Sequence, residues 1–232
     1  MSPTPMLAAI ALAFAGLAAD PARSAADPTR SRFASWLKVQ PEDISKVVAI
    51  DAPKGGWCTR ALVGTRKGPS FEATSVVLEH CDAKRCTSEL VSLGAAKTHG
   101  VVVRGIVDLD SPRDLDLDRL SAPAARVSNG ALVVETIAEG LHLTRELWIL
   151  PLRSKSSRAM FHGVLDSPSL RQTISASRGK AKSLDLVVHG EFQSGALPPG
   201  SGLTLPAGFD QRWQLRDGEY TTTDATPVCC PH

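Results

Sequence analysis

The sequence has few aromatic residues and almost no imbalance of charge. Phe, Trp and Tyr make up 5% of the 232 residues, and 26 basic residues oppose 24 acidic ones, for a formal net charge of +2. This even balance gives no electrostatic basis for binding nucleic acid or an anionic membrane surface. Hydrophobic residues at 43% and charged residues at 22% are typical of one globular domain. Disorder, collagen and a multi-span membrane protein are excluded.

Common catalytic and cofactor motifs are missing as well. The chain has no Gly-x-Ser-x-Gly elbow, no His-Glu-x-x-His motif and no glycine-rich phosphate loop. His189-Gly190-Glu191 matches a short element of zinc deaminases, but the Pro-Cys-x-x-Cys partner of that element is absent. We therefore expect no cofactor, and the sequence favours a protein that is not an enzyme without deciding the question. A secreted hydrolase with an Asp or Glu and a His assembled by the fold stays an alternative.

The chain has one long apolar run, from Met6 to Ala19. It is shorter than the roughly 20 residues of a transmembrane helix, and it suits the hydrophobic part of a secretory signal. Small residues suitable for cleavage follow it between positions 18 and 26. We expect residues 1–26 to be a signal peptide and 27–232 to be a single mature domain. That domain would have no membrane span and would lie in the periplasm or outside the cell.

Five cysteines are an odd number, so they cannot all pair within one chain. In an oxidising compartment we expect disulfides before metal sites. Cys81 and Cys86 flank a polar four-residue loop, and facing hairpin positions bring Cβ atoms to within about 4.5–5.5 Å, so we predict a bond between them. We also predict a bond from Cys58 to a tail cysteine, with Cys230 chosen and Cys229 left as the spare thiol. The connectivity remains open.

Two clusters are candidate metal sites. Asp114, Asp116 and Asp118 have the spacing that begins a calcium loop, and oxygen ligands suit Ca²⁺. The pattern then fails, because Arg119 stands where that loop needs Gly. We therefore favour a solvated acidic surface and keep calcium as the alternative. The tail Cys229-Cys230-Pro231-His232 could hold a soft metal, although a disulfide there is favoured.

Most of the chain alternates polar and apolar residues as half-buried strands do. Between 183 and 193, for example, Leu184 and Leu186 fall on one face, and His189 and Glu191 fall on the other. Such runs lie at 47–51, 57–65, 71–80, 86–93, 99–109, 131–138, 141–150, 158–166, 170–177, 183–193 and 209–216. About eleven strands separated by Gly- and Pro-containing turns predict an all-β fold, an antiparallel β-sandwich or barrel.

One short N-terminal helix is expected before the strands. Asp27 and Pro28 can cap and open it, Phe33 and Trp36 lie at helical spacing, and Pro41 ends the pattern.

A weak internal repeat occurs at an offset of 57 residues. Two short segments match: Val76-Val77 with Val133-Val134, and Thr87-x-Glu89-Leu90 with Thr144-x-Glu146-Leu147. The match predicts two duplicated meander units, 71–127 and 128–193, with chance similarity as the alternative.

These observations predict an exported, soluble, disulfide-containing all-β protein that acts as a binding or structural module. Its partner would be a protein or a carbohydrate, with no role for nucleic acid. Carbohydrates are usually held on exposed aromatic rings, and for each large candidate burial is the default expectation. The candidates are Trp36, Trp57, Trp148 and Trp213. A metal-binding protein stays an alternative.

Overall fold

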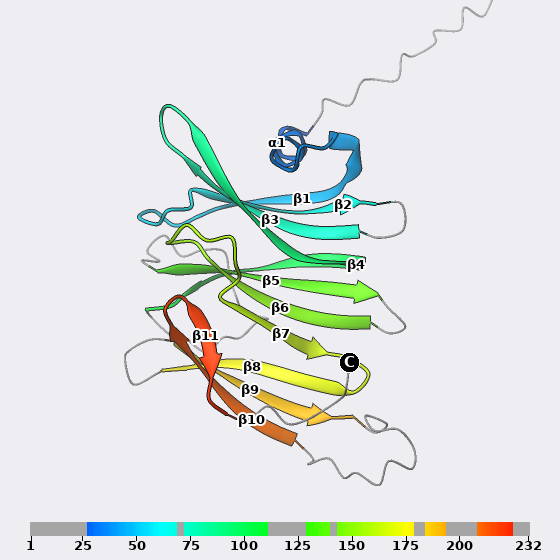
Figure 1. Ribbon diagram of the computed structural model, residues 1–232, viewed down its shortest axis with the longest axis vertical. Helices are drawn as coiled ribbons and strands as arrows, with labels where there is room; N and C mark the ends of the chain where they lie inside the picture. The colour runs from blue at the N-terminus through cyan, green and yellow to red at the C-terminus, as the bar shows by residue number, and fades with distance from the viewer. Residues whose placement is uncertain are drawn as a thin grey trace, which may run out of the picture.

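The computed structural model describes residues 27–68, 72–110, 129–139, 143–178, 184–193 and 208–224. In these ranges one α-helix and one 3-10 turn precede eleven strands, which pair antiparallel in chain order (Figure 1). The predicted all-β antiparallel class is therefore confirmed. The elements are α1 (Pro28–Leu37), η1 (Pro41–Asp43), β1 (Ile44–Asp51), β2 (Arg60–Lys67), β3 (Glu72–Cys81), β4 (Cys86–Asp108), β5 (Gly130–Glu139), β6 (Leu143–Pro151), β7 (Phe161–Asp166), β8 (Leu170–Arg178), β9 (Leu184–Phe192), β10 (Gly208–Arg216) and β11 (Glu219–Thr222).

The predicted signal peptide, residues 1–26, lies outside the described residues, so it stays a prediction. Within the described ranges, no helix is long and apolar enough to cross a membrane.

Helix α1 forms where the sequence predicts it. The Asp27 side chain accepts a hydrogen bond from the backbone N–H of Thr29 at 3.0 Å, and Pro28 occupies the first turn. The helix ends at Lys38, which adopts the left-handed conformation with φ 55°. Phe33 and Ala34 are buried, and they pack with Leu62 of β2 and Val77 of β3. The helix therefore covers one face of the first strands.

The number of strands agrees with the prediction, but two details are wrong. The predicted strands 86–93 and 99–109 are one continuous strand, β4, because the chain stays extended through Gly94, where φ is 112°. The short strand β11 was not predicted. It follows Asp217 and Gly218, which both have positive φ and make the tight turn that such a pair favours. Four residues are too few to show a period-two pattern.

Strand β4 belongs to two sheets. Up to Ala96 it pairs with β3, and from Lys97 onward it pairs with β5. The first sheet thus contains β1 to β4 and the second contains β4 to β11. In the described residues β1 and β11 stay at opposite ends of the strand order, so the sheet does not close into a barrel.

The central strands bury side chains on both faces. In β5, Leu132 and Val134 join a cluster formed with β2, β3 and β4, whereas Ala131 and Val133 join a cluster formed with β8, β9 and β11. All four side chains are fully buried. The sheet therefore encloses one apolar cluster on one face of its first half and another on the opposite face of its second half. This explains the unbroken apolar run in β5, which a strand with one solvated face would not have.

Backbone hydrogen bonds complete each curved half. The N–H groups of Trp57 and Cys58 donate to the carbonyls of Arg153 and Leu152, both at 2.9 Å. These bonds join the segment just before β2 to the segment just after β6. In the second half, the N–H of Tyr220 in β11 donates to the Met160 carbonyl at 2.8 Å. In each half of the sheet, backbone hydrogen bonds outside the strand ladder therefore hold the chain around the apolar cluster.

A buried carboxylate joins three strands of the second sheet. Glu135 in β5 is 1% exposed and accepts hydrogen bonds from Arg104 in β4 at 2.8 Å and from Arg145 in β6 at 2.7 Å. Burial alone would raise the pKa of this carboxyl, but the hydrogen bonds and charges of the two arginines outweigh it, and the pKa is lowered. The carboxylate is therefore held charged.

The matched segments lie in successive hairpins, β3–β4 and β5–β6, and the second predicted unit, 128–193, also contains β7 to β9. In the first strands Val76 and Val133 are both buried, but in different apolar clusters, which lie on opposite faces of the sheet. In the second strands Leu90 is exposed, whereas the aligned Leu147 is buried. The pairing registers differ by one residue, because Val76 pairs with Val91 but Val133 pairs with Ile149. A one-residue slip turns side chains to the other face. The duplication stays a prediction.

Candidate functional site

The candidate metal ligands cannot be placed. Asp114, Asp116 and Asp118 lie outside the described residues, as does the cysteine-rich tail, so the calcium and tail-metal hypotheses stay predictions. Just before the Asp cluster, the Asp108 side chain accepts from the N–H of Asp110 at 3.0 Å. Within the described ranges, no group of three or more His, Cys, Asp or Glu side chains could hold a metal ion.

The predicted disulfide between Cys81 and Cys86 is present and closes the β3–β4 hairpin. The Asp82 carboxylate organises the turn by accepting from the N–H groups of Lys84 at 2.7 Å and Arg85 at 2.8 Å. These two hydrogen bonds lower the pKa of Asp82. The turn is exposed, and Cys86 is exposed with it.

Cys58 is a buried thiol next to the same corner of the sheet. It has no disulfide partner among the described residues, and its Sγ contacts the carbonyl of Arg60 at 3.2 Å. Burial raises the pKa of Cys58 to about 11, which makes the thiol a poor nucleophile. Cys230 lies outside the described residues, so the predicted bond to it stays a prediction.

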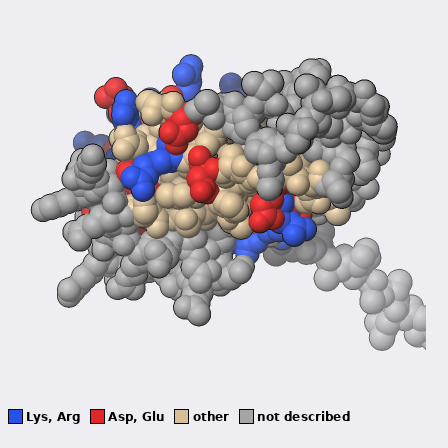
Figure 2. All heavy atoms as spheres, turned by 90° about the horizontal axis from the view of Figure 1, so that it is seen from below, with Lys and Arg blue, Asp and Glu red and all other residues tan. Residues whose placement is uncertain are grey.

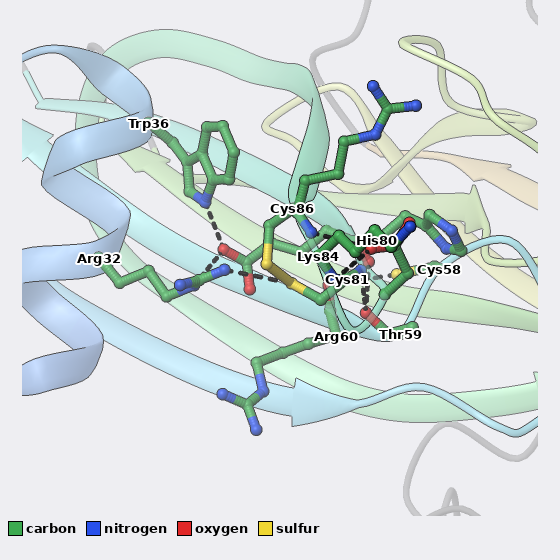
Figure 3. The surroundings of a disulfide bond; sticks show 12 residues. Arg32, Trp36, Cys58, Thr59, Arg60, His80, Cys81, Lys84 and Cys86 are labelled. Atoms are coloured by element: carbon green, nitrogen blue, oxygen red, sulfur yellow. Dashed lines mark hydrogen bonds and ion pairs between the residues drawn. A yellow bond between two sulfur atoms is a disulfide. The ribbon is translucent and has the colours of Figure 1, made fainter.

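A second buried carboxylate joins α1 to this disulfide (Figure 3). Glu79 of β3 is 1% exposed and accepts from Nε of Arg32 at 2.5 Å and from the indole N–H of Trp36. The other end of the Arg32 guanidinium, Nη2, lies 3.2 Å from Sγ of Cys81. One arginine of the helix thus contacts both a carboxylate and a disulfide sulfur.

The far end of the strand order carries a broad polar surface. On β8, β9 and β10, most side chains opposite the buried cluster are polar and exposed, although Val187 is half-buried and Asp185 is buried. We call this set the polar face: Arg171, Thr173, Ser175, His189, Glu191, Asp210, Arg212, Gln214 and Arg216. Seen from the β10 end, acidic and basic side chains are interspersed rather than gathered by sign (Figure 2). None of the nine is aromatic.

His189 is hydrogen-bonded to a carboxylate on the polar face. It lies directly opposite Asp210 in the β9–β10 ladder, with Nδ1 at 2.7 Å from Oδ1 of Asp210. Nε2 of the same ring is 3.6 Å from Glu191. The hydrogen bond to Asp210, together with the two negative charges, raises the pKa of His189. The ring therefore carries positive charge to a higher pH than an ordinary histidine.

A small pocket of about 110 Å³ opens beside the polar face between β10 and β11. Arg212, Gln214 and Arg216 line one side, because alternate residues of a strand share a face. Thr221, Thr223 and Asp224 complete it. In the described part of the chain, the guanidinium groups of Arg171, Arg212 and Arg216 have no ion-pair partner. The pocket could accept a small group that is rich in hydrogen-bond acceptors.

A second histidine–carboxylate pair lies on another strand pair. His162 of β7 stacks on Trp148 of β6, with ring centroids 3.7 Å apart, and its Nε2 is 3.2 Å from Glu146. Both this pair and His189–Asp210 lie on exposed surfaces, and no histidine lines the pocket described above. The histidines do meet carboxylates as a hydrolase would need, but outside that pocket. The hydrolase alternative stays a prediction without added support.

The sequence did not indicate the Arg32–Glu79–Cys81 contacts or the pocket. Arg32 and Glu79 are 47 residues apart, and their pairing depends on where α1 packs. A charged residue within the apolar run of β3 was the one available clue, since such residues are seldom buried unpaired. All four tryptophans are only partly buried.

Comparisons with protein families, with curated proteins and with solved structures found no match to this chain.

Proposed function

We propose that the protein is a binding module and that the polar face, with the pocket beside it, is its contact surface for a protein partner. The observation that carries this proposal is the set of three arginines on β8 and β10 without ion-pair partners among the described residues. Arginine is enriched in protein interfaces, and its planar guanidinium binds carboxylates through two hydrogen bonds.

A protein suits this surface better than a carbohydrate does. Sugars are usually held by stacking on aromatic rings, and the polar face has none. Charges of both signs lie on it, and His189 is hydrogen-bonded there to the carboxylate of Asp210. Such a mosaic gives specificity through complementary charge. We propose that a carboxylate side chain of the partner enters the pocket between Arg212 and Arg216.

We also propose that the protein is exported, as the N-terminal sequence predicts. The Cys81–Cys86 disulfide supports this location, because stable disulfides are rare in reducing compartments.

Site-specific photo-crosslinking tests the contact surface. A photoreactive residue replaces Ser175 on the polar face, or exposed Ser92 of β4 as the matched control, in the full-length protein produced in its own cells. We expect one covalent partner from position 175 and at least tenfold less of it from position 92. Equal capture from both positions, or none from 175, would contradict the proposal.

A further inference from the structure

We propose that Cys81–Cys86 is a redox-active disulfide that exchanges with thiols, with Cys81 as the leaving sulfur, stabilised by Arg32. This inference is independent of the proposed binding function. It rests on the contact between the Arg32 guanidinium and Sγ of Cys81 at 3.2 Å and on the exposed position of Cys86.

The charges around the two sulfurs differ. Cys81 is half-buried, and a guanidinium held by helix α1 lies directly against it (Figure 3). The Arg32 position is fixed, since its Nε bonds to the buried carboxylate of Glu79 at 2.5 Å. A cation beside a sulfur stabilises its thiolate and makes that sulfur the better leaving group. Cys86, which lies directly opposite Cys81 in the hairpin, is the more exposed of the two residues, so we expect an attacking thiol to reach it first.

The turn that joins the two cysteines adds positive charge at the point of approach. Lys84 and Arg85 are exposed there, and the one acidic residue of the turn, Asp82, already accepts from two backbone N–H groups. An anionic thiolate reagent is therefore drawn toward Cys86. Cys58 takes no part, because its thiol is buried.

The exchange balances in two steps. A thiolate RS⁻ attacks Sγ of Cys86, the Cys81–Cys86 bond breaks, and Cys81 leaves as a thiolate while RS–S–Cys86 forms. A second RS⁻ attacks the R sulfur of this mixed disulfide, which releases RSSR and the Cys86 thiolate. Protons from solvent neutralise the thiolates as their equilibria require. Two electrons pass from two thiols to the protein, and a disulfide substrate reverses the steps.

Titration of the full-length protein in glutathione redox buffers tests the proposal. Thiols are trapped by alkylation and read by mass spectrometry after trypsin, which cuts after Lys84 and Arg85 and so separates the two cysteines. We expect the bond to be reduced in buffers that leave ordinary structural disulfides intact. Glutathione trapped on the protein should be on Cys86 at least fivefold more than on Cys81. A bond that stays oxidised at every buffer ratio would overturn the proposal, as would equal trapping on both cysteines.

Two variants of opposite effect separate the role of Arg32 from simple exposure. Arg32→Met should lower the equilibrium constant for reduction about tenfold, which corresponds to about 30 mV. Glu79→Gln should raise it at least threefold, because the amide oxygen of Gln can still accept from Nε of Arg32 while the negative charge that opposes Arg32 is gone. Arg60→Met, which removes a nearby arginine that pairs with Asp51, is the control and should stay within twofold. If Arg32→Met does not fold, the Glu79→Gln variant and the trapping ratio still test the proposal. An equilibrium constant for reduction that is unchanged in Glu79→Gln would contradict it.

Discussion

The two ends of the strand order differ in the side chains that they place on the open face of the sheet and in what covers them. At the first end, β1 to β3 present apolar side chains, and α1 covers them with Phe33 and Ala34. At the other end, β8 to β10 present the polar face, and no described element covers it. We therefore expect the apolar end to need its cover for stability and the polar face to tolerate substitution. Exposed arginines without ion-pair partners among the described residues fit the binding role that we propose for that face.

Removal of the helix anchor should give the largest effect. Phe33 is fully buried, and Phe33→Ala should destabilise the protein by about 3–5 kcal/mol through lost burial and a new cavity. Ser175→Ala on the polar face should change stability by no more than about 0.5 kcal/mol. Denaturant unfolding measures both. Similar losses of stability in Phe33→Ala and Ser175→Ala would contradict this difference between the two ends.

The interior between the two ends should be sensitive to acid. Glu135→Gln removes a buried charge but little volume, and we expect a loss of about 1.5–3 kcal/mol at pH 7 from the weakened bonds to Arg104 and Arg145. Because the folded pKa of Glu135 is lowered, its contribution is present above the unfolded pKa and disappears as pH falls through the folded one. Variant and wild type should therefore converge in acid.

Unfolding curves recorded from neutral to acidic pH test this expectation, with exposed Glu191→Gln as the control. A gap between Glu135→Gln and wild type that widens in acid would contradict the assigned charge.

The His189–Asp210 pair of the polar face should have the smallest effect on stability. Asp210→Asn removes the main cause of the raised pKa of His189, so that pKa should fall. Because the pKa of His189 is higher in the folded state, the pair stabilises the fold at a pH below the unfolded pKa. This stabilisation is lost as the pH rises through the folded pKa. Both side chains are exposed to solvent, so the pH dependence of unfolding should scarcely change. NMR titration of the ring measures the shift, with Asp51→Asn as the control. An unchanged titration in Asp210→Asn would show that the hydrogen bond does not form in solution.

The sequence was sufficient for features that depend on neighbours along the chain. Asp27 and Pro28 predicted the start of α1, period-two runs predicted the all-β class, and the Cys81–Cys86 spacing predicted the disulfide. Each of these signals comes from residues close together in the sequence, and so do the interactions that form the predicted feature.

Features that depend on distant packing could not be predicted in this way. The junction of two sheets within β4 depends on which strand lies opposite each half, and the period-two runs at 86–93 and 99–109 gave no sign that they join. Arg32 meets Glu79 only because α1 packs on β1 to β3. The pocket likewise needs β11, a strand too short to show its period.

Capture of the partner by a double variant tests the binding account most directly. Arg212→Ala with Arg216→Ala removes both pocket arginines from exposed or half-exposed positions, so the melting temperature should stay within about 2 °C of wild type. Crosslinking from position 175 should fall at least tenfold, while Arg60→Ala, an exposed arginine elsewhere, should leave it unchanged. Undiminished capture by the folded double variant would contradict the claim that these arginines bind the partner.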